Sequence, residues 1–284
     1  MNRRNNSKGK VCLTVDLEFL NQKSLSESKT KAESFDLDQD EIVENLLSLL
    51  DETDSKVTFF VVASLVEENP GLVERISDKG HEIASHALTH KNLREMTKEE
   101  MRDEIGESKR ILEEKINEEV LGFRAPGLKI LGDKVFYQLL DEFNYKYSSS
   151  KIPSLPIPGW YGDLSIPMKP FRISEFYDFE VDNRIFEVPV SVNPFLRLPF
   201  SGNWLRLLGH NYFYWSLDKL IEKDIIPVFY IHPWELMDLS AVSNLPIRNK
   251  IRSGTWLFNK IRKVCERYEI DSVRNILDIN KNKD

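Results

Sequence analysis

Short apolar runs alternate with amphipathic stretches through the first half of the chain. The apolar runs are brief and rich in β-branched residues, which is typical of strands that are covered on both faces. They span residues 10–16, 56–62, 81–85, 120–126 and 145–149. Apolar residues at helical spacing fill the stretches between them, at residues 38–52, 69–80, 97–116 and 132–144. This order of strand and helix predicts a parallel sheet with helices packed outside it.

Residues 151–210 break the alternation, because they are rich in proline, glycine and aromatic residues. We interpret them as long loops that elaborate one face rather than as a second domain. A helix at about 212–223 and a strand at 225–232 then restore the pattern. The chain is therefore predicted to have a flexible tail at residues 1–9 and a single α/β domain at residues 10–280, a length that suits a barrel.

The charge balance and the cysteines narrow the class of protein. With 39 Lys and Arg against 46 Asp and Glu, the net charge is −7, and no broad basic field is present to bind nucleic acid. Cys12 and Cys265 are far apart, which favours two buried thiols over a disulfide. Neither a spanning run of about 18 apolar residues nor a signal-peptide pattern occurs. We therefore expect a cytoplasmic protein that could contact the inner face of the membrane.

Polar side chains follow several of the predicted strands, at the point where each strand ends. In parallel α/β barrels the carboxyl ends of the strands meet on one face, so these side chains should converge although they are far apart in sequence. The residues concerned are Asp16, Glu18, His86, Arg124 and His232. Their shared position predicts an active site.

His86 and His90 could bind one metal ion. Histidines four positions apart offer two imidazole nitrogens if the chain turns after the strand, and a nearby carboxylate completes a three-ligand site. On their own, the two histidines fit a metal site and an ordinary turn equally well. Asp16 and Glu18 favour the metal site, because two carboxylates on the same face of a strand would repel each other without a cation. One of them could bind metal while the other transfers protons.

Arg124 and His232 extend the candidate site. A buried arginine at a strand end needs a carboxylate partner, and Asp16 is the expected one. A lone histidine after a strand is more often structural, but the position of His232 at a strand end favours catalysis. Beside it, Pro233 and Trp234 predict a stiff aromatic rim that suits a sugar face or an apolar wall.

Four motifs give the chain a family resemblance. LTVDLE, GHEIASHALTH, GFRAP and FYIHPWE occur in the order and approximate spacing of the polysaccharide deacetylases, the NodB-homology or carbohydrate esterase family four group. The resemblance covers roughly residues 10–240, and its RAP and HPWE forms are most similar to the branch found in exopolysaccharide gene clusters. It implies a deformed (β/α) barrel and a divalent metal ion, usually Zn²⁺, with Co²⁺, Ni²⁺ or Mn²⁺ as alternatives.

The resemblance also implies a role for each site residue. Asp16 matches the catalytic base, Arg124 the arginine that orients the base, and His232 the general acid. The metal ligands match Glu18, His86 and His90. To these we add three residues that we expect to contact the substrate or the oxyanion, the latter through a backbone N–H near Gly127. They are Pro126, Gly127 and Trp234.

The implied activity is removal of an N-acetyl group from an N-acetylated sugar, either nucleotide-linked or lipid-linked at the membrane. Two alternatives remain open: hydrolysis of a non-sugar C–N amide bond, as in the allantoinase-like relatives, and glycan binding without catalysis. Retention of Asp16 and His90 argues against the second alternative, whereas Phe19 and Ser148 stand where relatives often carry acids and keep it open. The family's later tryptophan motif has two candidates, Trp160 and Trp204. The sugar, its carrier and the oligomeric state do not follow from the sequence.

Overall fold

One largely parallel sheet organises the chain. The computed structural model describes residues 8–19, 39–130, 132–157, 161–181, 184–240, 242 and 245–279. Within these residues, nine strands follow the order β6-β7-β5-β4-β3-β2-β1-β8, with β9 beside β1. Every pair is parallel except β6 with β7. The strands are β1 (Lys10–Leu17), β2 (Thr58–Val61), β3 (Glu82–Ser85), β4 (Gly122–Phe123), β5 (Tyr147–Ser148), β6 (Phe171–Arg172), β7 (Phe186–Glu187), β8 (Val228–Ile231) and β9 (Glu269–Ile270).

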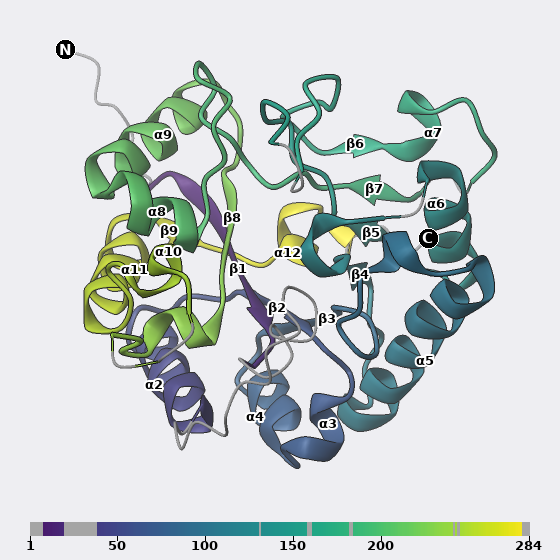
Figure 1. The fold of residues 1–284 in the computed structure, drawn as a ribbon, viewed down its shortest axis with the longest axis horizontal. Coiled ribbons are helices and arrows are strands. Elements are labelled where there is room, and N and C mark those ends of the chain that lie inside the picture. The colour runs from purple at the N-terminus through teal and green to yellow at the C-terminus, as the bar shows by residue number, and fades with distance from the viewer. Residues whose placement is uncertain are drawn as a thin grey trace.

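Helices surround the curled sheet (Figure 1). Their order along the chain confirms the parallel α/β arrangement that the sequence pattern predicts. Within the described residues, none of them combines the length and the apolar character needed to cross a membrane. The helices are α2 (Gln39–Glu52), α3 (Leu65–Glu68), α4 (Leu72–Asp78), α5 (Lys98–Ile116), α6 (Asp133–Glu142), α7 (Ile173–Phe176), α8 (Gly202–Leu208), α9 (His210–Glu222), α10 (Ile247–Lys250), α11 (Thr255–Arg267) and α12 (Val273–Ile276). The short 3₁₀ turns are η1 (Leu93–Glu95), η2 (Pro126–Leu128) and η3 (Pro233–Leu236).

β1 lies in the interior of the sheet and is buried on both faces. Leu13 and Val15 belong to the main core between sheet and helices, whereas Cys12 faces a second apolar cluster. β1 pairs with β2 on one side and with β8 on the other. Burial on both faces is what parallel sheets require, and it explains the nearly continuous apolar sequence of this strand. Both cysteines are free and buried, as predicted.

Residues 151–210 contain regular elements as well as loops. β7 enters the sheet in parallel beside β5, and β6 forms its antiparallel edge. α8 and α9 then pack against each other and lead to β8. This segment therefore adds strands to the same sheet. The division of the whole chain into a tail and one domain stays a prediction, because residues 1–7 lie outside the described residues.

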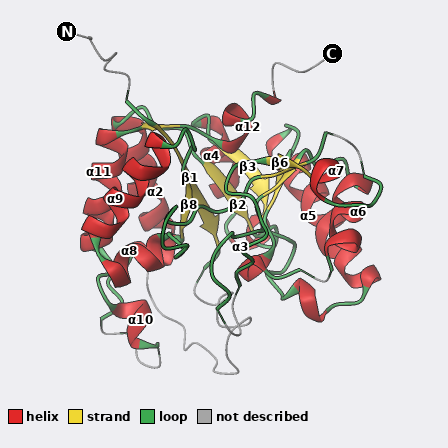
Figure 2. Cartoon of the chain, turned by 90° about the horizontal axis from the view of Figure 1, so that it is seen from above, coloured by secondary structure: helices red, strands yellow, loops and turns green. Residues whose placement is uncertain are grey.

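The two ends of the sheet carry different chemistry. β1 begins near α12 and runs toward the opposite end of the molecule (Figure 2). At the amino end, Thr58 Oγ1 accepts a hydrogen bond from the backbone N–H of Val273 at 2.9 Å, and a Glu82 carboxylate oxygen accepts one from Arg274 at 2.9 Å. These bonds satisfy the first N–H groups of α12, which no helical carbonyl can reach. The site residues lie at the other, carboxyl end.

Candidate metal and catalytic site

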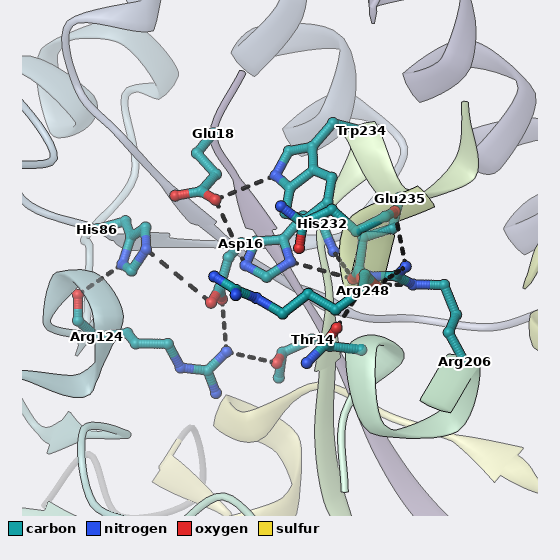
Figure 3. A network of polar contacts seen from close by, with 12 residues as sticks. Thr14, Asp16, Glu18, His86, Arg124, Arg206, His232, Trp234, Glu235 and Arg248 are labelled. Atoms are coloured by element: carbon teal, nitrogen blue, oxygen red, sulfur yellow. Dashed lines mark hydrogen bonds and ion pairs between the residues drawn. The ribbon is translucent and has the colours of Figure 1, made fainter. Parts of the chain in front are cut away.

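Glu18, His86 and His90 gather at the carboxyl end of the sheet. Glu18 directly follows β1, His86 directly follows β3, and His90 comes from the turn beyond it. One ligand atom from each lies within 4.8 Å of the other two, and all three side chains are buried. In Figure 3 the imidazole of His86 is directed toward Asp16, and the carboxylate of Glu18 is linked to the indole of Trp234. The sequence separates Glu18 widely from the two histidines, and the parallel strands β1 and β3 bring them together.

The turn that carries the two histidines has a constrained backbone. Ala87 and His90 adopt positive φ angles of 67° and 58°, which reverse the chain so that both imidazoles face the same side. A carboxylate oxygen of Glu104, on α5, accepts the backbone N–H groups of Leu88 at 3.0 Å and Thr89 at 2.9 Å. The chain bends after β3, which is the condition for both histidines to bind one metal ion. The role of Glu104 in holding this bend could not be predicted, because Glu104 lies in a long helix whose polar sequence is typical of a solvent-exposed face.

The imidazole of His86 is held in one tautomer. Its Nδ1–H donates to the backbone carbonyl of Arg124 at 2.8 Å, so Nε2 carries the lone pair and faces Asp16 Oδ2 at 4.0 Å. Burial lowers the pKa of His86 to about 4, so the ring is neutral at pH 7. A neutral imidazole fixed in this way is ready to bind a metal ion.

His90 and Glu18 complete the candidate metal site. Nε2 of His90 contacts a carboxylate oxygen of Glu18, while its buried Nδ1 has no hydrogen-bond partner among the described residues. The other oxygen of Glu18 accepts the indole N–H of Trp234 at 3.1 Å. Two imidazole nitrogens and one carboxylate oxygen form the donor set of catalytic zinc sites that keep a position open. These residues therefore fit Zn²⁺ or a chemically similar divalent ion.

Arg124 fixes Asp16 beside the candidate metal site. Its guanidinium is completely buried and donates to Asp16 Oδ1 at 2.6 Å, which confirms the predicted pairing. The remaining donors bond to Thr14 Oγ1 at 2.7 Å, Ser149 O at 3.0 Å and Ser149 Oγ at 2.8 Å. The guanidinium also lies 4.0 Å from the ring centre of Phe60. Asp16 is thus locked in one orientation, with Oδ2 directed toward His86.

His232 approaches the site from the far side, on the residue that follows β8. Its Nε2 lies 3.5 Å from Glu18 Oε1. The carboxylate of Glu235 binds the opposite edge of the His232 imidazole. Glu235 Oε2 lies 3.0 Å from the backbone nitrogen of His232 and 3.1 Å from its Nδ1 (Figure 3). Glu235 in turn pairs with Arg206 of α8 at 2.7 Å, and both side chains are completely buried. Neither Arg206 nor Glu235 was predicted as a site residue. Glu235 could have been found, because an acid three positions after the histidine in HPWE is a recognisable capping pattern.

Glu235 is charged despite its burial, and we predict a pH-dependent contribution to stability. Burial raises its pKa, but the Arg206 guanidinium and the hydrogen bonds from His232 outweigh burial and lower the pKa to about 2. A carboxyl group whose pKa is lower in the folded state stabilises the fold at pH values above its unfolded pKa of about 4.5. This contribution to the free energy of unfolding, up to about 3 kcal/mol, is lost as the pH falls toward 2. Glu235→Gln should therefore flatten the pH dependence of the free energy of unfolding over this window, as measured by denaturant titration.

A matched control is Glu107→Gln, since Glu107 forms an exposed ion pair with Arg110 on α5. Exposed pairs contribute little, so this variant should keep the pH dependence of the unmodified protein. Identical curves for Glu235→Gln and the unmodified protein would show that the buried pair does not couple folding to protonation.

Trp234 requires a correction. The sequence predicted an exposed aromatic rim that contacts the substrate, but only 1% of Trp234 is exposed. Its ring stacks on His232 at a centroid distance of 4.8 Å, and its N–H is used by Glu18. A buried indole needs a hydrogen-bond acceptor, and the acceptor here is a ligand of the candidate metal site. Trp234 therefore orients Glu18 instead of forming a rim.

The remaining predicted residues, Pro126 and Gly127, lie in η2, which begins two residues after Arg124. Pro126 is buried in η2, while Gly127 is exposed and has a φ of 60°, a conformation that favours glycine. Their contact with substrate or oxyanion stays a prediction. Of the two tryptophan candidates, Trp204 donates its N–H to Tyr161 Oη at 3.1 Å, and Trp160 lies outside the described residues.

Comparisons with known proteins relate the two halves of the chain to two family models. Residues 24–148 match the polysaccharide deacetylase family, and residues 149–278 match DUF3473, a domain of unknown function. A peptidoglycan-N-acetylglucosamine deacetylase of Bacillus cereus is 33% identical over 91 residues, which are 32% of this chain and 42% of that protein. The chain thus covers less than half of the length of this curated relative.

Solved structures share the fold over almost the whole chain. A Mycobacterium smegmatis protein named for the polysaccharide deacetylases has a TM-score of 0.67 at 20% identity, with 99% of this chain and 93% of that chain covered. PuuE allantoinase has a TM-score of 0.63 at 15% identity, with 97% and 91% covered. The deformed (β/α) barrel implied by the sequence motifs is confirmed. The likeness to the polysaccharide deacetylase family is therefore a sequence match over residues 24–148 and a fold shared with solved structures over almost the whole chain.

Proposed function

We propose that this protein is a metal-dependent hydrolase that removes the acetyl group from an N-acetylated sugar. One observation carries the proposal: the carboxylate of Asp16, fixed by Arg124, lies 4.0 Å from a histidine of the buried Glu18, His86 and His90 cluster. A proton acceptor directly beside a metal-ligand set is the arrangement that amide hydrolysis needs. Bound to that cluster, a divalent ion would polarise the amide carbonyl and make a water molecule more acidic.

Asp16 and His232 divide the proton transfers. Asp16 accepts the proton of the attacking water through Oδ2, since Oδ1 is bonded to Arg124. His232 donates a proton to the departing amine through Nε2, while Glu235 accepts a hydrogen bond from Nδ1–H and fixes the orientation of the ring. The products are acetate and a free amino sugar. Arg124 and Glu235 act by orienting these two groups, because neither side chain faces the open part of the site.

The names of the matched relatives support the proposed substrate class. The matched Bacillus cereus relative is named for N-acetylglucosamine in peptidoglycan, and a matched Bradyrhizobium relative is named for chitooligosaccharides. Both names share an N-acetylated glucosamine unit. We therefore propose an N-acetylated sugar of a glycan biosynthetic pathway as the substrate, with Zn²⁺ as the first candidate ion, and a cytoplasmic location.

Metal removal tests the proposal directly. We expect the purified protein to contain a divalent metal and to release acetate from N-acetylated glucosamine oligomers, and we expect a chelator to abolish this release until the ion is restored. Metal analysis by mass spectrometry and an enzymatic acetate assay measure both quantities. Allantoin is included as the amide control.

The outcomes separate the alternatives. Opening of the allantoin ring without acetate release would favour the non-sugar amide hydrolase. Glycan binding by calorimetry without any acetate release would favour the non-catalytic binding protein. Absence of both metal and hydrolysis would overturn the proposal itself.

A further inference from the structure

Exposed apolar side chains gather around the short helix α10. Ile247 and Ile251 are 76% and 42% exposed, and they stand four positions apart at its two ends. α10 packs against α8, whose last residues, Leu207 and Leu208, are 37% and 43% exposed. Scattered exposed aliphatic residues are ordinary, but four on two elements that contact each other mark a candidate interaction surface.

Basic residues are concentrated in the sequence on both sides of α10, although the whole chain is acidic and Arg262 is paired with Glu52 of α2. The net charge of the chain is −7, yet no Asp or Glu occurs between Asp238 and Glu266. The cations in that interval are Arg248, Lys250, Arg252, Lys260, Arg262 and Lys263. Trp256 is half-buried at the start of α11, and the cationic groups of Arg252 and Lys260 each lie 5.4 Å from its ring centre. Amphipathic tryptophan beside basic and aliphatic residues is typical of segments at a membrane surface.

The α10 segment lies at the same end of the molecule as the candidate site. In Figure 2, α10 projects from the end opposite α12, which is the end toward which β1 runs. Hydrogen bonds connect the chain around α10 to residues of the candidate site. The backbone N–H of Gly254 donates to the carbonyl of Glu235 at 2.9 Å. Arg206 also donates to the carbonyls of Asn249 at 2.8 Å and Ile251 at 3.1 Å. A surface bound through α10 would therefore face the site residues.

We propose that this α10 surface, made of Leu207, Leu208, Ile247, Ile251, Trp256 and the neighbouring basic residues, docks on an anionic lipid bilayer. The aliphatic side chains enter the boundary between head groups and acyl chains, and the basic side chains attract anionic head groups. Both contributions are needed for stable peripheral binding, because each alone is weak. The docking goes beyond the proposed function. Its consequence, that the site meets a lipid-linked glycan, rests on that function.

A bilayer fits the α10 surface better than a second copy of the chain does. A symmetric dimer places the same patch on both partners, so the cations around α10 would face each other. Like charges across an interface oppose association. An anionic bilayer complements both the charge and the apolar character of the patch.

Vesicle sedimentation tests the proposal with the full chain. We expect binding to vesicles of phosphatidylglycerol mixed with phosphatidylcholine, little binding to phosphatidylcholine alone, and weaker binding as salt rises. The double variant Ile247→Asp, Ile251→Asp should bind about tenfold less, because it removes apolar contact and adds negative charge. Phe195→Asp is the matched control, since Phe195 is 57% exposed on a different loop and should not affect binding.

Each outcome of these measurements supports or overturns the docking proposal. Failure of the unmodified protein to sediment with anionic vesicles overturns the docking proposal, and so does a loss of binding in the control but not in the double variant. A dimer by light scattering that the double variant abolishes, without vesicle binding, assigns the patch to a second copy instead. Acetate release from a water-soluble oligomer should be unchanged in the double variant, so a failed deacetylase proposal and a failed docking proposal give different results.

Discussion

Replacing Asp16 by asparagine should lower acetate release by about 10²- to 10⁴-fold, the range that a positioned general base contributes. Asparagine is nearly isosteric and can still accept a hydrogen bond from Arg124, but it cannot accept a proton. Glu18, His86 and His90 are unchanged, so the metal content should equal that of the unmodified protein. The variant therefore separates proton transfer from metal binding, by acetate assay and metal analysis on the same sample.

A folding measurement and a control variant are needed to assign the loss of activity in Asp16→Asn to proton transfer. The buried Arg124 loses its charged partner, which can cost about 3 kcal/mol of stability, so circular dichroism and a denaturant titration must show that Asp16→Asn is folded. Asp218→Asn is the matched control, because Asp218 pairs with Arg267 on the outer helices and should leave the rate unchanged. Undiminished acetate release by folded Asp16→Asn would remove Asp16 from the mechanism.

Replacing His86 or His90 by alanine should remove most of the bound metal. Loss of residues that merely support metal ligands already weakens affinity by roughly 10- to 100-fold, and loss of a ligand should exceed that. His232→Ala should keep the metal and lose turnover, since the cluster of candidate metal ligands consists of Glu18, His86 and His90 and does not include His232. Metal analysis after dialysis against a weak chelator measures the difference.

His210→Ala is the control for these histidine variants, because His210 starts α9 and takes no part in the candidate site. It should retain both metal and activity. Equal metal loss in His86→Ala and His232→Ala would show that the proposed separation of metal ligand and general acid is incorrect.

The convergence of the site could be predicted from the sequence because strand ends determine it. Parallel strands place the residues that follow them on one face, whatever their separation along the chain. The pairing of Arg124 with Asp16 was predictable for a second reason: a completely buried guanidinium has few stable alternatives to a carboxylate. Both inferences need only the position and the chemical type of a residue.

The supporting contacts could not be predicted, because they depend on three-dimensional neighbours. Glu104 lies on a helix whose sequence reads as a solvated face, yet its carboxylate closes the histidine turn. Arg206 and Glu235 are 29 positions apart, and no spacing rule links them. Trp234 was misinterpreted for the same reason, since aromatic character alone does not say which way an indole faces. Long-range partners of this kind set the orientation of the site side chains.

Arg124 contacts the two halves of the site through two different parts of one residue. Its side chain holds Asp16, and its main-chain carbonyl holds the imidazole of His86. A displacement of the chain after β4 therefore moves the proton acceptor and the candidate metal ligand in the same direction. The distance between Asp16 and His86 should therefore fluctuate less than the position of either residue. Thermal motion of the surrounding loops should change this distance little, and hydrolysis depends on it.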